Sequence, residues 1–404
     1  MFICNLRPAN VCAQSFNVLD VGTPTGTGIY SEAHGISALG AACGEWQSST
    51  NAVNQRAFLY SNGTNADLAP TQGINLIAYS VNRSNHVVGE AGFAFTHAFL
   101  YTNGVITDLG TLGTGTYSVA WAINDFDQIV GESLNANGPF AQDHGVWWHD
   151  GTKTDLGVLA TGDYSSARGI NASNAIVGEA SIVSAGVTNV VAFLYTNGVM
   201  RNLGTLPGGN YSSARAINEA GDIVGEASVS NGDTHAFLYQ NGVMSDLGTF
   251  GGNGSSASAI NNSGQIVGYA LDASGKSRAF LYSGSGMLDL NDHIPSSLVC
   301  TSLVSADGIN NRGQIAASGF TGTGTYHAFL LTPGTFLTLP TMLPDGEFRV
   351  TVNGAAGQQF VLEGCANLPN WIPVSTNILT TNSLDCTDKS AVTNRYKFYR
   401  ARLL

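Results

Sequence analysis

The chain has little positive charge. Only 16 of its 404 residues are Lys or Arg, against 28 Asp or Glu, and its formal net charge is −12. Such a surface repels the phosphates of nucleic acids and anionic membranes, which argues against these partners but is compatible with cations and neutral ligands. No apolar run approaches the ~20 residues of a membrane-spanning helix. We therefore expect no nucleic-acid partner and no membrane span, and we expect a monomer.

The chain also has few cysteines and no sharp catalytic motif. Its six cysteines form no Cys-x-x-Cys pair, which argues against a zinc knuckle. Gly-x-Ser-x-Gly, P-loop and His-Glu-x-x-His motifs are all absent, so the sequence predicts neither a serine-hydrolase triad nor an organic cofactor. Cys365 and Cys386 could form a disulfide, which would suit an oxidising compartment. Cys43 and Cys300 could also pair, but buried free thiols are the stronger expectation.

Glycine, by contrast, is abundant, with 50 residues against a usual ~7%. Much of it belongs to a repeat that occurs seven times, seen best in Ala214–Glu226, His235–Gly242 and Asp246–Gly248. A period of 41 to 49 residues without helical periodicity is typical of radial β architectures. The spacing is measured between the Phe positions of the motif Ala-Phe-Leu-Tyr, which are Phe58, Phe99, Val146, Phe193, Phe237, Phe280 and Phe329.

Each repeat is predicted to contain four short strands. Strand a is Ser-Ala-x-Ala-Ile-Asn, strand b is Gln-Ile-Val-Gly-Glu, strand c is Ala-Phe-Leu-Tyr, and strand d is Val-x-x-Asp-Leu-Gly. An Asn-x-x-Gly turn, as in Asn261–Gly264, joins strands a and b. The dipeptide Asn-Gly, as in Asn241–Gly242, joins strands c and d and is the strongest short signal for a hairpin.

The strand count predicts how the ring closes. Strand d follows strand c only six times, whereas a seventh Asp-x-Gly precedes the first strand a at Asp20–Gly22. Phe16–Gly22 would then complete the last blade and remove an unpaired sheet edge. The prediction is an all-β, seven-bladed β-propeller closed by its N-terminal strand. The alternative, an open β-solenoid, leaves this segment unexplained.

The repeat resembles the bacterial extracellular HAF-repeat family. The motifs that carry the resemblance are His97-Ala98-Phe99, His235-Ala236-Phe237 and His327-Ala328-Phe329, with the Ile-Asn, Ile-Val-Gly-Glu and Asp-Leu-Gly-Thr-Leu segments around them. It covers roughly residues 16–333, and the third repeat departs from it at His144-Gly145-Val146. The resemblance implies a secreted protein with a propeller-like fold. It implies no particular activity and no catalytic residues.

The ends of the chain differ from the repeats. Residues 1–13 are expected to be a leader remnant, because Val11-Cys12-Ala13 has the small-residue character of a signal-peptidase site, although no apolar segment precedes it. The propeller is assigned to residues 14–334 and a linker to residues 335–345. Residues 346–404 resemble the small β-sandwich appended to many secreted bacterial proteins, for which attachment or sorting is the expected role.

The position x in the strand a motif Ser-Ala-x-Ala-Ile-Asn differs from repeat to repeat, whereas the residues beside it stay nearly the same. This makes position x a candidate for ligand contact. His34, Arg168, Arg215 and Asp307 could supply acid–base or catalytic groups there, and nearby tyrosines add aromatic edges. The alternative is packing between blades. The long b–c loops, such as Ser133–Asp143 and Ser181–Val190, mark the binding face. The remaining ligand-binding candidates are Tyr79, Trp121, Ser258, Tyr117, Tyr164 and Tyr211.

A second set of candidate site residues consists of the Glu that ends strand b. Equivalent carboxylates could bind Ca²⁺, a cation that prefers several oxygen ligands, and the metal candidates are Glu132, Glu179 and Glu226. The competing expectation is a cross-strand pair with the first residue of strand c. The expected pairs are Glu45 with Arg56, Glu90 with His97, Glu132 with His144, and Glu226 with His235, which leaves Glu179 opposite Val191.

Two functions follow. The first is a secreted propeller that binds a small molecule or glycan near the central axis, on the face of the variable loops. The alternative is a calcium-dependent hydrolase or lactonase with its active site at the axial mouth, which rests on analogy of fold alone.

Overall fold

The computed structural model describes residues 16–24, 28–48, 55–69, 74–136, 142–284, 286–295, 299–334, 336–337, 341–342, 348–354, 359–365, 372–380, 383–388 and 398–403. The predicted leader and most of the predicted linker lie outside these residues. Within the described part the chain is a series of β-strands with one short 3₁₀ helix, η1 (Leu290–His293). None of its helices is long and apolar enough to span a membrane.

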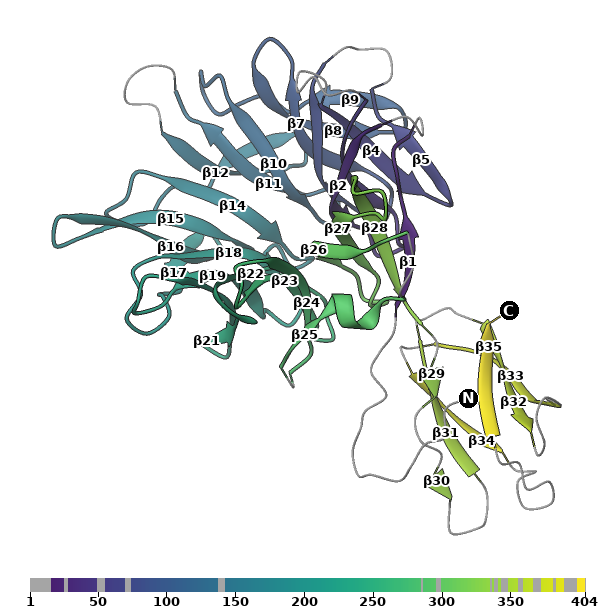
Figure 1. Cartoon of the computed structure of the whole chain (residues 1–404). Helices are drawn as coiled ribbons and strands as arrows, with labels where there is room; N and C mark the ends of the chain where they lie inside the picture. Colours follow the sequence, from purple (N-terminus) through teal and green to yellow (C-terminus); the bar gives the residue numbers. More distant parts are fainter. Residues whose placement is uncertain are drawn as a thin grey trace.

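The predicted four strands occur in every repeat, and the sheets follow one another in sequence order around the molecule (Figure 1). Strands a are β2 (Tyr30–Ile36), β6 (Leu76–Val81), β10 (Ser118–Ile123), β14 (Ser165–Ile170), β18 (Ser212–Ile217), β22 (Gly251–Ile260) and β26 (Ser302–Ile309). Strands b are β3 (Ala42–Gln47), β7 (Val87–Gly92), β11 (Ile129–Leu134), β15 (Ile176–Ser184), β19 (Ile223–Ser228), β23 (Ile266–Asp272) and β27 (Ile315–Phe320).

Strands c are β4 (Gln55–Ser61), β8 (Thr96–Thr102), β12 (Asp143–His149), β16 (Val187–Thr196), β20 (Thr234–Gln240), β24 (Ser277–Tyr282) and β28 (Tyr326–Pro333). Strands d are β5 (Thr64–Asp67), β9 (Val105–Asp108), β13 (Thr152–Asp155), β17 (Val199–Asn202), β21 (Val243–Gly248) and β25 (Met287–Asp289), and β1 (Phe16–Asp20) stands at this position beside β28. In each repeat the neighbouring strands pair antiparallel in the order a, b, c, d. These are β-propeller blades.

The turns are those that the sequence predicts. Asn241 and Gly242 between β20 and β21 both have positive φ, 53° and 82°, which is the backbone of the type I′ hairpin. In the a–b turn the last residue has positive φ and is Gly in some repeats, such as Gly221, and Asn or Asp in others, such as Asn174 and Asp127. Asn and Asp tolerate this left-handed region better than other non-glycine residues.

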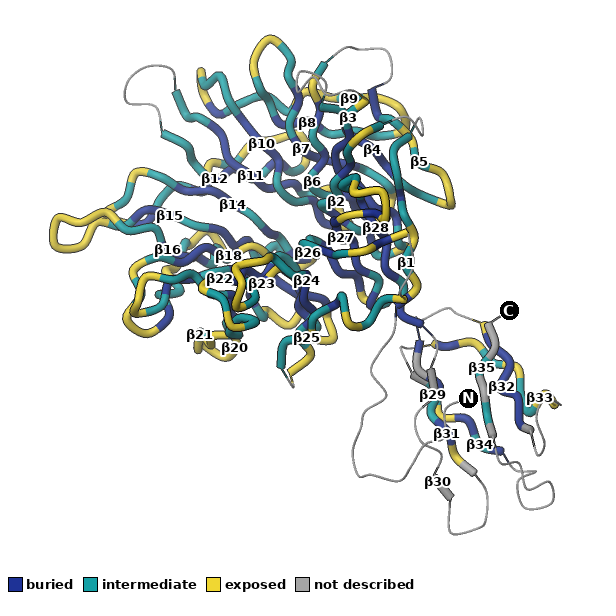
Figure 2. Tube along the Cα trace, in the orientation of Figure 1, coloured by how far each residue is buried: buried dark blue, intermediate teal, exposed yellow. Residues whose placement is uncertain are grey.

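The blades pack through a repeated aromatic core. The Phe of strand c, such as Phe237, is fully buried in six repeats, and Val146 replaces it in the third. It packs between its own blade and the preceding one, so the buried residues follow the inner strands while the turns are exposed (Figure 2). Strand b must pass close to strand a at its Gly. A Cβ at Gly225 would overlap the carbonyl oxygen of Ser213, so this position requires glycine.

The Asn that ends strand a forms a ladder that the sequence analysis did not anticipate. Its Oδ1 accepts hydrogen bonds from its own turn, as Asn171 does from Ala175 N at 3.0 Å. Its Nδ2 donates to the backbone carbonyl of the equivalent residue in the next repeat. The donors and acceptors are Asn82 to Asn124, Asn124 to Asn171, Asn171 to Asn218, Asn218 to Asn261, Asn261 to Asn310, and Asn310 to Ser37.

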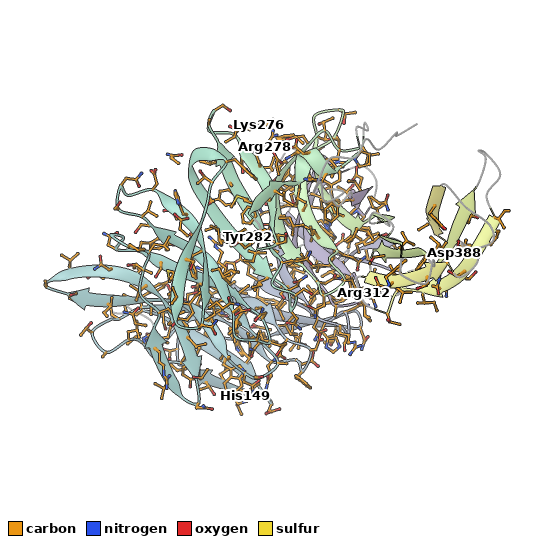
Figure 3. The ribbon with its side chains drawn as sticks, turned by 90° about the horizontal axis from the view of Figure 1, so that it is seen from below. His149, Lys276, Arg278, Tyr282, Arg312 and Asp388 are labelled. Carbon is orange, nitrogen blue, oxygen red and sulfur yellow. The ribbon has the colours of Figure 1, made fainter. Side chains whose placement is uncertain are left out.

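The predicted pairs between the Glu of strand b and the first residue of strand c are wrong by one position of register. Glu90 lies opposite Ala98, and His97 lies opposite Ala91. Because side chains alternate between the faces of a sheet, His97 is on the other face and binds Asp108 of strand d, with Nδ1 at 3.0 Å. The same contact joins His144 to Asp155, His235 to Asp246, His327 to Asp20, Arg56 to Asp67, and Arg278, labelled in Figure 3, to Asp289.

The C-terminal region forms two further sheets. One contains β29 (Phe336–Leu337), β30 (Thr341–Met342), β31 (Phe348–Asn353) and β34 (Ser383–Asp388). The other contains β32 (Gln359–Cys365), β33 (Ile372–Ile378) and β35 (Phe398–Leu403). Val352 and Phe360 belong to one apolar core shared by the two sheets. Because β29 and β30 pair with β31, the described part of the predicted linker belongs to this region.

The predicted disulfide of the C-terminal region is not formed. Cys386 is a buried free thiol on β34, whereas Cys365 lies on β32 of the other sheet. The expected alternative for the propeller is confirmed, because Cys43 and Cys300 are buried and free. Burial raises the pKa of the Cys300 thiol to about 11, which keeps it protonated and unreactive at neutral pH.

Candidate functional site

The variable residue of strand a occupies a β-bulge in every repeat. In the fifth repeat Ala214 pairs with Gly225 and Ala216 pairs with Val224, so Arg215 between them has no partner residue on strand b. A bulge of this kind re-aims one side chain without disturbing the rest of the strand. The unpaired residues of the seven repeats are His34, Tyr79, Trp121, Arg168, Arg215, Ser258 and Asp307.

These seven residues line one cavity of about 370 Å³ on the central axis. Toward the a–b turns, the cavity is bounded by Ile36 and Ile309, which also line a second space of about 260 Å³ inside the asparagine ladder. The structure therefore brings together all seven positions that the sequence analysis singled out. The sequence did not predict the bulges. They explain why these side chains turn to the axis.

Three aromatic side chains form an arc over the first three repeats. The ring centroids of His34 and Tyr79 are 5.6 Å apart, and those of Tyr79 and Trp121 are 4.5 Å apart. The guanidinium of Arg168 continues the arc, because its Cζ lies 4.3 Å from the centre of the Trp121 ring. Such a cation–π contact holds both side chains in place. The three rings and the guanidinium thus pack in succession along the wall of the cavity.

The two arginines are held by the Glu and Tyr residues that the sequence analysis placed in separate sets. Arg168 donates to Glu179 Oε1 at 3.0 Å, and Tyr164 donates to the same oxygen at 3.0 Å. The fifth repeat reproduces the arrangement with Arg215, Glu226 and Tyr211, at 3.1 and 3.0 Å. In the second repeat Tyr79 donates to Glu90 at 3.2 Å. The two sets of residues that the sequence predicts separately therefore form one hydrogen-bonded network.

The expectation that Glu179 lacks a partner is therefore wrong. Burial alone would raise the pKa of Glu179, but the Arg168 guanidinium and hydrogen bonds from Ser213, Arg168 and Tyr164 hold it below its usual value. Tyr117 lies near Glu132 and Glu90, whose charges together with burial raise the pKa of its phenol above the usual range. Burial raises the pKa of Glu132, although the charge of Arg168 opposes this shift.

The first and last repeats bring acidic side chains together. Glu32, which the sequence analysis missed, lies on strand a directly opposite Glu45 on strand b. Tyr30 donates a hydrogen bond to Glu32. Burial and the charge of Glu32 raise the pKa of Glu45 to about 7. Asp307 accepts a hydrogen bond from Ser305 at 2.8 Å, yet burial and the charge of Glu32 raise its pKa to about 7 as well.

Two buried polar atoms at the cavity have no hydrogen-bond partner among the described residues. They are Nε2 of His34 and Nε1 of Trp121, and both residues line the cavity. Burial lowers the pKa of His34, against the opposing charge of Glu32, so its imidazole is neutral at pH 7. A buried polar group without a hydrogen-bond partner is energetically costly.

Two of the predicted metal ligands are already engaged by neighbouring side chains. Glu179 and Glu226 each accept hydrogen bonds from an arginine and a tyrosine. In the part of the chain that the structure describes, no group of three or more His, Cys, Asp or Glu side chains is placed to hold a metal ion.

Comparison with solved structures identifies the fold. The chain is similar to the β-propeller domain of the Trilobed protease from Pyrococcus furiosus, with a TM-score of 0.50, 8% identity, and coverage of 75% of this chain and 93% of that domain. A match to TolB from Acinetobacter baumannii has a TM-score of 0.36 and 12% identity, and covers 73% of this chain and 80% of that one. No family model and no curated protein matches the sequence. The likeness shows a β-propeller and no activity.

Proposed function

We propose that this protein is a binding module that takes a small polar molecule, such as a sugar or the end of a glycan, into its axial cavity. The observation that carries the proposal is the row of bulges. Seven repeats turn seven side chains into one cavity, although their neighbours in strand a are nearly the same. Packing between equivalent blades would be served by one residue type at that position. The variety of residues is what a single asymmetric ligand requires.

The chemistry of the lining suits a sugar. The pyranose ring has apolar faces, which pack on aromatic side chains such as Tyr79 and Trp121, and hydroxyl groups, which need convergent donors and acceptors. Arg215, Ser258 and Asp307 supply these on the other side of the cavity. Arg215 is the most open of them, because 43% of its side chain is exposed.

Fluorescence and calorimetry of Trp121 variants test the proposal. A panel of mono- and disaccharides is titrated into the full chain, and a ligand in the cavity is expected to change tryptophan emission. Trp121→Phe should weaken binding about tenfold or more, because it removes the buried Nε1 donor and part of the stacking surface. Trp147→Phe is the matched control, since Trp147 stacks on His149 and does not line the cavity. Equal effects of both substitutions would contradict the assignment.

We also propose that the propeller has seven blades and that β1 closes the ring. Two observations support this. All five residues of β1 pair with β28, from Phe16 opposite Pro333 to Asp20 opposite Phe329. The asparagine ladder runs through all the repeats and returns from Asn310 to Ser37. Secretion and membership of the HAF-repeat family are proposed on the sequence motifs alone, and so is an attachment or sorting role for the C-terminal region.

The calcium-dependent hydrolase or lactonase is the less favoured proposal. Calcium at Glu179 or Glu226 would have to displace a guanidinium and a tyrosine hydroxyl from each carboxylate. A calcium titration monitored by calorimetry distinguishes the two proposals. Binding that disappears in Glu132→Gln and Glu179→Gln variants would support the metal enzyme. Sugar binding that is unchanged by a chelator would support the binding module.

A further inference from the structure

We infer that the ligand of the axial cavity carries a positively charged ammonium group, and that this group binds beside Glu32, Glu45 and Asp307. The inference rests on the proposed function and specifies the chemical class of the ligand. Amino sugars with a free amine are the simplest molecules that combine such a group with the sugar chemistry above. We call Glu32, Glu45, Glu90 and Asp307 the acidic sector.

The first feature is the imbalance of charge around the axis. The network around the cavity contains seven carboxylates, the four of the acidic sector and Glu132, Glu179 and Glu226, but only two guanidiniums. Of these groups, Asp307 and the two guanidiniums line the cavity itself. Both arginines are in the fourth and fifth repeats, where they bind Glu179 and Glu226. In the described part of the chain no Lys or Arg forms an ion pair with a carboxylate of the acidic sector. A cation from outside would correct this imbalance.

The second feature is the set of aromatic side chains beside these carboxylates. The aromatic faces of His34 and Tyr79 adjoin the acidic sector, and Tyr30 and Tyr326 stack there with ring centroids 5.5 Å apart. Aromatic faces attract ammonium groups as well as sugar rings. The Trp121 ring already accommodates a cation in this way, because Arg168 lies over it.

The third feature is His34, whose side chain has a nitrogen without a hydrogen-bond partner. Its Nε2 is buried and without a partner, and the residue lines the cavity between Tyr79 and Asp307 in the order of the repeats. The Glu32 charge acts on this imidazole, but burial keeps it neutral. A neutral imidazole can present an unprotonated nitrogen, which accepts a hydrogen bond from an ammonium N–H. An arginine or lysine at this position would have repelled the same group.

The raised pKa values of two carboxyls in the acidic sector are consistent with a bound cation. Glu45 faces Glu32, Glu90 and Tyr30, and Asp307 faces Glu32, Arg215, Ser258 and Ser305. Burial, together with repulsion from Glu32, raises the pKa of both carboxyls to about 7, so each holds a proton part of the time at neutral pH. A bound cation favours the ionised carboxylates. Binding should therefore release protons, which calorimetry in buffers of different ionisation enthalpy measures.

The experiment compares three disaccharides of similar shape on the full chain at pH 6.5. They are the β-1,4 dimers of glucosamine, of N-acetylglucosamine and of glucose, and calorimetry measures their affinities. The glucosamine dimer is expected to bind at least tenfold more tightly than the other two. The double variant Glu32→Gln, Glu45→Gln should lose this preference and keep the weaker binding of the neutral sugars. Asp150→Asn is the matched control, because the side chain of Asp150 is 94% exposed and outside the cavity.

The outcomes separate the inference from the proposed function. Equal binding of all three dimers, sensitive to Trp121→Phe, would overturn the inference and leave the sugar-binding proposal standing. No binding of any dimer and no change in tryptophan emission would overturn both. Calcium binding that requires Glu45 and Asp307 and blocks the glucosamine dimer would also overturn the inference, because the sector would then serve an inorganic cation. A thermal melt confirms that each variant is folded.

Discussion

Single residues around the cavity differ in how their buried charges are compensated. Arg168 and Glu179 form a partly buried pair that also includes Tyr164 and the face of Trp121. Breaking such a pair leaves a charge without its partner, and the cost is commonly about 3 kcal/mol or more. The acidic sector lacks this compensation and is therefore expected to respond to pH.

The first prediction concerns Arg168→Met. We expect a loss of about 3 kcal/mol of unfolding free energy at pH 8 and a smaller loss at pH 5, because Glu179 can then take up a proton. Urea denaturation at both pH values measures this. The double variant Arg168→Met, Glu179→Gln should recover part of the loss at pH 8. An equal loss at both pH values would indicate that packing on Trp121, and not the charge of Glu179, is decisive.

The second prediction is a decrease in stability as pH rises from about 5 to 8. Glu45 has a folded-state pKa of about 7, above the ordinary 4.5, so between these values the folded chain binds a proton that the unfolded chain has released. A rise from 4.5 to about 7 corresponds to about 3 kcal/mol for this residue, which is 7% exposed. Denaturation curves of the wild type and Glu45→Gln measure it. If the variant keeps the same slope against pH, another group is responsible.

At the scale of elements, strand a and strand b are fitted to each other at two places, the bulge and the glycine. The bulge directs Arg215 to the axis, and Gly225 allows strand b to pass the carbonyl of Ser213. These two features explain why the residue types around the variable position are nearly the same in every repeat.

The third prediction is that Gly225→Ala is strongly destabilising, by more than about 2 kcal/mol, because the added Cβ would force the two backbones apart. Gly221→Asn is the control. Gly221 has a φ of 86° in the a–b turn, where the second and fourth repeats have Asn85 and Asn174, and nothing lies within 4 Å of its Cβ position. This change should be nearly neutral in thermal denaturation. Similar losses for both variants would contradict the close approach.

The elements also show how far the sequence alone could predict the structure. The strand order and the hairpins follow from short signals such as Asn241–Gly242, because their backbone requirements are local. The contact of His97 with Asp108 could not be predicted reliably, since a change of register by one residue moves a side chain to the other face. The bulge at Arg215 escaped prediction for the same reason, although the convergence of the variable residues was expected. Glu32 was missed because no other repeat has a Glu there.

In the whole molecule, the repeats surround one cavity, and each repeat contributes a different type of side chain to its lining. The ladder of asparagines and the pairing of β1 with β28 are contacts between segments far apart in the sequence, and in Figure 1 the purple β1 lies beside the green β28. The shape of the cavity depends on these contacts because each repeat supplies one residue to it.

The fourth prediction tests the closure by β1. Val18 pairs with Leu331, so cysteines at both positions should form a disulfide on oxidation and raise the thermal midpoint, because the bond ties together segments more than 300 residues apart. The control is Leu19→Cys with Leu331→Cys, in which the side chains point to opposite faces and should not pair. Mass spectrometry detects the crosslink. Equal crosslinking of both variants would mean that β1 is not held in this register.

A crystal structure of the full chain soaked with the glucosamine dimer would locate the ligand directly. The sugar is expected on the axis, with its ring against Tyr79 or Trp121 and its amine within hydrogen-bonding distance of Glu45, Glu32 or Asp307. A sugar bound only on the outer surface, or an axial cavity that contains solvent alone at a saturating concentration of the dimer, would contradict this expectation.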